Sequence, residues 1–174
     1  MSEAAIMISL RLVHIISGAL WVGAILFVAV FLVPAVRSSG AGGAQIMQEL
    51  VKRRFHVYMG VLPILVVLSG FTMYLRLTIQ THGAFARTPV GIALGTGGSI
   101  ALVALIIGGA VVGRTVNALT TLGAQLQTTG GPPSPAQHQE VQRLQARLAA
   151  SAKVVSVLVL VTTSLMATAR YLSF

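Results

Sequence analysis

Long apolar runs alternate along the chain with short clusters of basic and small residues. The runs predict membrane spans at about residues 11–36, 55–77, 88–113 and 152–172. A helix needs about 20 apolar residues to cross a bilayer, and in lipid it satisfies its own backbone amides. The last run is the shortest, so Lys153 and Arg170 are expected to extend their charged ends to the two interfaces. The pattern predicts an all-α integral membrane protein, a four-helix bundle forming one domain over residues 1–174.

Helical spacing continues beyond the third span and before the fourth. Residues 114–151 are expected to form a helical hairpin that extends helices 3 and 4, with a break at 128–135 and with apolar seams at Val116, Leu119, Leu122, Leu126, Val141, Leu144 and Leu148. Ser134 is predicted to cap the second helix, with Pro135 in its first position and Gln137 completing the capping box.

The first connection has a similar organisation. Small residues at 38–43 predict a turn, and the apolar spacing at 45–54 predicts a helix that runs straight into the second span.

Composition supports this architecture and excludes several kinds of chemistry. The chain is 55% hydrophobic and 9% charged, with a mean hydropathy of +0.87. It contains no cysteine and no aspartate, and its only acidic residues are Glu3, Glu49 and Glu140. Thiolate metal sites, covalent haem and a catalytic carboxylate pair within the membrane are therefore excluded. We assign no catalytic residue and expect a binding protein more than an enzyme.

The net charge of +9 is interpreted as topology information, with no nucleic-acid partner. Two of the connections carry Arg37, Lys52, Arg53, Arg54, Arg114, Arg143, Arg147 and Lys153, whereas the opposite side carries Arg11, Arg76, Arg87 and Arg170. Basic residues favour the cytoplasmic side. This predicts a multi-pass protein of a bacterial-type inner membrane, with both termini outside and the residue 114–151 hairpin in the cytoplasm.

Candidate chemistry begins in the first span. One helical stripe joins Arg11, His14, Gly18, Trp21, Ile25, Val28 and Leu32. An ionisable residue inside a membrane is a functional hypothesis by default. His14 is the candidate cofactor ligand, and the alternative is a hydrogen bond from its ring to a neighbouring helix.

The second span has a comparable stripe, consisting of His56, Gly60, Pro63, Val67, Gly70 and Tyr74. Its alternative is that His56 belongs to the headgroup zone beside Lys52. In an antiparallel hairpin that turns near Gly40, His14 is level with about residue 66. His14 and His56 are then offset by about 15 Å and cannot bind one iron unless the turn is strongly asymmetric.

A group of Met and His residues and a pair of glycines suggest two further kinds of site. Met7, Met73 and His82 are expected near the outer end of the bundle with His14, a donor set that suits Cu(I); methionine in such a bundle is otherwise a packing residue. Gly91 and Gly95 in the third span form a small-residue face for a partner helix, within a larger membrane complex or a homo-oligomer.

The segment Arg11-Leu-Val-His14-Ile-Ile-Ser-Gly18-Ala-Leu-Trp21-Val-Gly23, followed by Phe27 and Pro34, resembles the first helix of the copper-resistance D family and of the related HemJ-type protoporphyrinogen oxidases. The resemblance covers about the first 75 residues. It implies a four-helix membrane bundle in which His14 binds b-type haem or copper. The oxidase pattern is matched only in part, because Ala35-Val36-Arg37 follow Pro34.

Three functions are therefore carried forward. The first is a haem b protein for electron transfer, an accessory subunit of a larger membrane complex, in which His14 and His56 are candidate haem ligands. Arg11 would pair with a propionate, and Gly18, Trp21 and Gly60 would shape the site. The second is copper transport or handling through Met7, His14, Met73 and His82. The third is a structural subunit without a cofactor.

Overall fold

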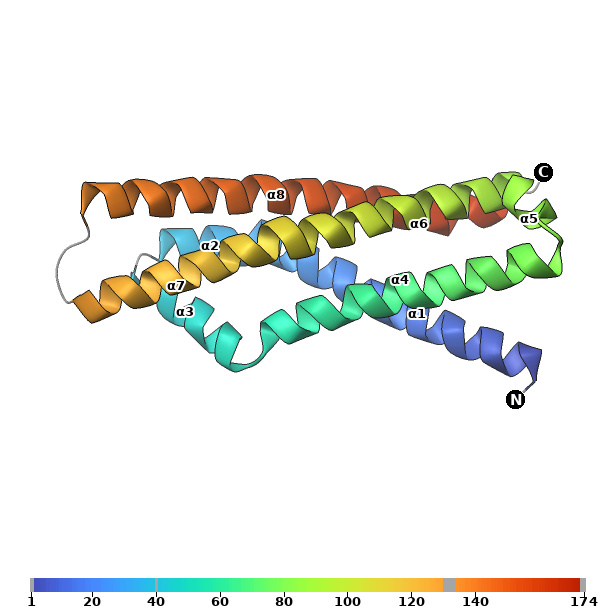
Figure 1. Cartoon of the computed structure of the whole chain (residues 1–174), viewed down its shortest axis with the longest axis horizontal. Helices are drawn as coiled ribbons and strands as arrows, with labels where there is room; N and C mark the ends of the chain where they lie inside the picture. The colour runs from blue at the N-terminus through green and yellow to red at the C-terminus, as the bar shows by residue number, and fades with distance from the viewer. Residues whose placement is uncertain (1, 40, 130–133, 173–174) are drawn as a thin grey trace.

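The computed structural model describes residues 2–39, 41–129 and 134–172, and every regular element within these ranges is helical (Figure 1). The first half of the chain contains α1 (Glu3–Phe27), the π-helical segment η1 (Val28–Leu32), α2 (Val33–Ser38), α3 (Ala41–Lys52) and α4 (Phe55–Gln80). The second half contains α5 (Ala84–Arg87), α6 (Pro89–Ile107), the π-helical segment η2 (Gly108–Gly113), α7 (Arg114–Thr129), α8 (Pro135–Thr168) and the 3₁₀ segment η3 (Ala169–Leu172).

Four helical stretches are long and apolar enough to cross a membrane: Glu3–Val36, Phe55–Gln80, Pro89–Leu126 and Pro135–Leu172. Large apolar side chains cover their outer faces, and Ile8, Phe31, Phe71 and Ile79 are each at least 60% exposed. In water such surfaces would cause aggregation, whereas in a bilayer they contact lipid. The chain is therefore a multi-pass membrane protein with an all-α four-helix bundle, as its sequence predicts.

Consecutive spans pair with each other. α1 packs mainly against α4, and α6 packs mainly against α8, so the bundle consists of two antiparallel helix pairs. Both ends of the chain lie at the end of the bundle that carries α5, opposite the end that carries α3 (Figure 1). An ion pair between Arg76 and Glu3, 2.7 Å long, joins α4 to α1 near the N-terminus.

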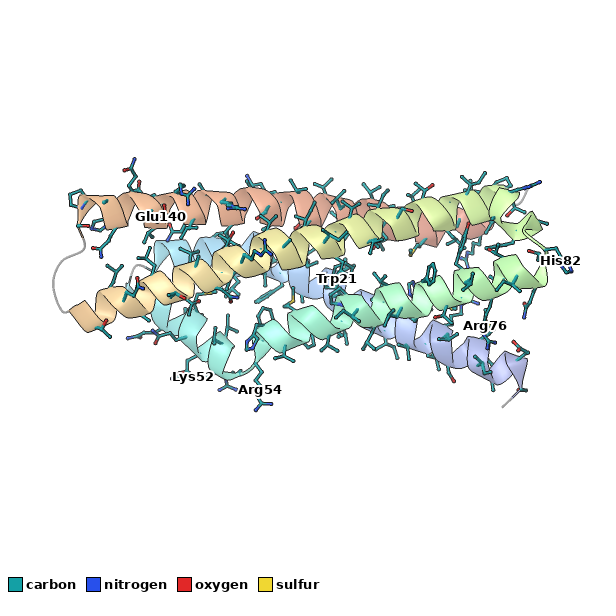
Figure 2. The ribbon with its side chains drawn as sticks, viewed as in Figure 1. Trp21, Lys52, Arg54, Arg76, His82 and Glu140 are labelled. Atoms are coloured by element: carbon teal, nitrogen blue, oxygen red, sulfur yellow. The ribbon has the colours of Figure 1, made fainter. Side chains whose placement is uncertain are left out.

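One apolar core unites the two pairs. It consists of Trp21, Ile25, Leu62, Val66, Ala104, Val155 and Val159. Trp21 is 5% exposed and lies between the two helix pairs (Figure 2). Ala104 is completely buried although its side chain is small, which shows that α6 packs closely against its neighbours at this level.

The connection between α3 and α4 differs from its prediction. Residues 45–54 do not run straight into the second span, because α3 ends at Lys52 and Arg54 adopts a left-handed conformation with φ 56°. α3 therefore lies at an angle to α4 (Figure 1). The expected turn at 38–43 is also shorter, since α3 begins at Ala41; residue 40 lies outside the described residues.

The helical extension of α6 and α8 is confirmed. α7 packs against α8, with Leu144 buried and the other predicted seam residues half-buried. Ser134 caps α8 as predicted. Its hydroxyl accepts a hydrogen bond from the backbone N–H of Gln137, and the side-chain oxygen of Gln137 accepts one from the backbone N–H of Ser134. Within the predicted break at 128–135, α7 continues to Thr129, and residues 130–133 lie outside the described residues.

Candidate functional site

The predicted stripe of α1 faces the interior of the bundle from His14 onward. His14 and Gly18 are half-buried, and Trp21 and Ile25 are buried on the same stripe. Arg11, one turn before His14, is exposed. The stripe therefore places one imidazole at the contact between α1 and α4, within the predicted first span.

The imidazole of His14 has a defined hydrogen-bond partner on α4. Its Nδ1 lies 2.9 Å from the carbonyl oxygen of Val66 and 3.3 Å from Oγ of Ser69. A carbonyl oxygen only accepts, so Nδ1 carries the proton and donates it to Val66. Nε2, the other ring nitrogen, is not used in this hydrogen bond. The predicted level of His14 with residue 66 is thus confirmed, and the ring makes a hydrogen bond to the neighbouring helix α4.

Gly70 leaves room on α4 for the imidazole ring of His14. A Cβ atom at residue 70 would lie 2.7 Å from Cε1 of His14 and 3.0 Å from Nδ1, both well inside van der Waals contact. Across the same seam, a Cβ atom at Gly18 would lie 3.9 Å from Cγ2 of Val66, which is an ordinary contact. A side chain at residue 70 would therefore push the His14 ring away from α4, whereas the space beside Gly18 already borders a Val66 methyl group.

Two buried serines lie close to His14 and are not among the predicted site residues. Ser17 is 4% exposed and Ser69 is 5% exposed. Each hydroxyl donates to a carbonyl one turn earlier on its own helix, Val13 and Leu65 respectively. Serines that bond back to their own helix are common in apolar helices, so their presence alone is a weak signal for a site. Their place on the stripes beside His14 and Gly70 could have revealed them.

The second predicted histidine lies elsewhere. His56 is in the first turn of α4 and is exposed, and Gly60 is exposed as well, with no atom within 4 Å of a Cβ built on it. His56 precedes Val66 by ten residues, which is about 15 Å along a helix. His14 and His56 therefore do not share a site. From Pro63 onward the predicted stripe faces inward, with Pro63 buried and Val67, Gly70 and Tyr74 half-buried, and Leu62, Val66 and Ser69 complete the buried face of α4.

The residues proposed for copper are only partly brought together. Met7 and Met73 are half-buried on the paired helices α1 and α4, toward the end marked by the Arg76–Glu3 ion pair. His82 is exposed in the turn after α4, with φ 49°, and Figure 2 shows it at the tip of the bundle. Among the described residues, no group of three His, Cys, Asp or Glu side chains is placed to hold a metal ion.

The glycine face of α6 is used within the chain. A Cβ atom at Gly91 would lie 1.9 Å from the carbonyl oxygen of Phe85, and one at Gly95 would lie 3.0 Å from Oη of Tyr74. Tyr74 and Phe85 also contact each other edge to face. Gly91 therefore allows α5 to pack closely on α6, and Gly95 allows the same for α4. A second copy of the chain would have to displace Phe85 and Tyr74 to pack on these two glycines.

Comparison with protein-family models, with curated proteins and with solved structures finds no match to this chain. The resemblance of the first helix to the copper-resistance D family therefore rests on the residues around His14.

Proposed function

We propose that this protein is a membrane-embedded b-type haem-binding protein for electron transfer, an accessory subunit of a larger membrane complex, in which His14 would hold the haem iron. One observation carries the proposal: Nδ1 of His14 donates to the Val66 carbonyl at 2.9 Å. Histidines that ligate metals almost always donate their other ring N–H to a carbonyl or a carboxylate, which fixes the tautomer and strengthens the ligand. His14 already has that arrangement.

The contacts around His14 support a role as a single ligating imidazole. The Val66 carbonyl accepts a hydrogen bond from Nδ1, and Gly70 leaves room for the ring against α4. Both contacts fix the orientation of the ring, and with it the position of Nε2. Arg11 is exposed one turn away, where its guanidinium can pair with a propionate. When bound, haem supplies the one-electron chemistry, while the protein supplies ligation and an apolar surrounding. His56 and Gly60 do not belong to this site.

The test replaces one histidine at a time, His14 in the proposed site and His56 outside it. Asparagine in place of His14 can still donate to the Val66 carbonyl but offers no imidazole Nε2. We expect the purified wild-type protein to show Soret and α bands after dithionite reduction, His14→Asn to lose them, and the exposed-residue control His56→Ala to keep them. Absence of these bands from wild-type protein expressed with sufficient haem, or their persistence in His14→Asn, would refute the proposal.

A structural subunit without a cofactor is the second candidate, and the same hydrogen bond favours it. The bond joins α1 to α4 with no further ligand, and such interhelical bonds are an ordinary means of helix association in membranes. This candidate predicts that His14→Asn, which preserves the bond, leaves both stability and spectrum unchanged. Copper handling through His14, Met7 and Met73 predicts instead stoichiometric copper by metal analysis and no haem bands.

We further propose a bacterial-type inner membrane with both termini outside. The support is the distribution of charge between the two ends of the bundle. Lys52, Arg53 and Arg54 lie at the end with α3, whereas Arg87 follows the turn at the opposite end, where both termini also lie (Figure 1). The bias of basic residues toward the cytoplasm would then place α3 and the α7–α8 hairpin inside the cell.

A further inference from the structure

α3 is an amphipathic helix beside a membrane span. Its apolar residues Ile46, Met47, Leu50 and Val51 share one side, and the opposite side is polar. Met47 and Leu50 are half-buried against the chain, while Ile46 is 42% and Val51 38% exposed. The described part of the chain thus covers the middle of this apolar side and leaves its two edges uncovered.

A shallow hollow runs along one of these edges. It has a volume of about 310 Å³ and is lined by Gln45, Ile46, Glu49, Leu50 and Arg53. Ile46 and Leu50 therefore share this hollow with Arg53 and with Glu49, whose carboxylate is paired with Lys52. The remaining positive charge beside apolar side chains suits a molecule with an anionic group joined to an apolar portion.

The charge at the end of α3 is positive. Lys52, Arg53 and Arg54 are consecutive and exposed, and Figure 2 shows Lys52 and Arg54 at the bend, directed away from the other helices. Lys52 donates to Glu49 at 2.6 Å, and this hydrogen bond holds the pKa of Glu49 below its usual value. With three positive groups and one negative group, the segment carries a net charge of +2.

The position of α3 identifies the partner. α3 ends at Lys52, and the membrane-spanning α4 begins at Phe55, so the basic residues are joined directly to a span. The left-handed Arg54 turns α3 away from the axis of α4. We propose that α3 lies on the membrane surface and binds anionic phospholipid, with the arginines on the phosphate groups and Ile46 and Leu50 on the apolar portion of the lipid. Basic amphipathic helices bind anionic bilayers by this combination of forces.

The chain contains no cysteine, so Ile46→Cys gives a single attachment site for an environment-sensitive fluorophore. The full-length labelled protein is reconstituted in nanodiscs of phosphatidylcholine alone or of phosphatidylcholine with phosphatidylglycerol. We expect the phosphatidylglycerol nanodiscs to shift the emission to the blue and to expose the fluorophore to quenching by brominated lipid. Adding Arg53→Gln and Arg54→Gln should lower the ratio of lipid-buried to water-exposed fluorophore roughly 25-fold, about fivefold for each arginine.

A matched control removes the same charge elsewhere. Arg114→Gln with Arg147→Gln changes two exposed arginines on α7 and α8 and should leave the emission unchanged. The proposal is overturned if the emission is the same in both lipids, or if the control pair reduces the shift as much as the Arg53 and Arg54 pair. A fluorophore shielded equally in both lipids would show that α3 is covered by protein, an outcome that also overturns the proposal.

Discussion

Replacing Gly70 by alanine tests the contact between His14 and α4. The new Cβ would lie 2.7 Å from Cε1 of His14, whereas non-bonded carbon atoms are most stable at about 3.5–4.0 Å. The ring would have to withdraw by about 1 Å, and its 2.9 Å hydrogen bond to Val66 would lengthen or break.

Three terms set the magnitude of this effect. Overpacking costs about 1–3 kcal/mol. Loss of the hydrogen bond costs about 0.5–1.5 kcal/mol. Alanine is the better helix former by about 1 kcal/mol, which offsets part of the cost. We therefore expect Gly70→Ala to lower the free energy of unfolding by about 1–3 kcal/mol.

The assay is reversible unfolding in mixed micelles, followed by far-UV circular dichroism. Gly60→Ala is the matched control, because it makes the same change on the same helix with no atom within 4 Å of the new Cβ. It should be neutral or stabilising by up to about 1 kcal/mol. In a His14→Ala background, Gly70→Ala should no longer destabilise, since the ring that it displaces is absent. Equal stabilities for Gly70→Ala and Gly60→Ala would refute the reasoning.

Two further substitutions probe other contacts. Ser134→Ala removes the capping box of α8 and should cost about 1 kcal/mol; amide hydrogen exchange should then accelerate in the first turn of α8, and unchanged exchange there would contradict the assignment. Thr162→Val removes the hydrogen bond from Thr162 to the Gly97 carbonyl, which is 3.2 Å long and joins α8 to α6. Its expected cost is about 0.6 kcal/mol in the same unfolding assay, with exposed Thr163→Val, whose hydroxyl bonds within α8, as the control.

The sequence predicts the spans, the α8 cap and the level of His14 on α4, because each depends on local spacing or on helix geometry. It predicts the α1 stripe well, since His14, Gly18 and Trp21 break the apolar pattern on one side only. The corresponding interpretation of α4 fails at His56 and Gly60. The stripe faces inward from Pro63 to Tyr74, but its first two members are exposed, because spacing along one helix does not say at which level a neighbouring helix begins to cover it. The break at Arg54 was also not predicted, because an arginine with positive φ has no glycine to mark it.

The pairing of consecutive spans has a consequence for how the protein is made. Each pair contains its own polar link, His14 to Val66 in the first and Thr162 to Gly97 in the second. Helices inserted into a bilayer associate after insertion, so the first pair can close while the ribosome is still synthesising α8. In that order of events, two hairpins that have each closed dock on one another around Trp21.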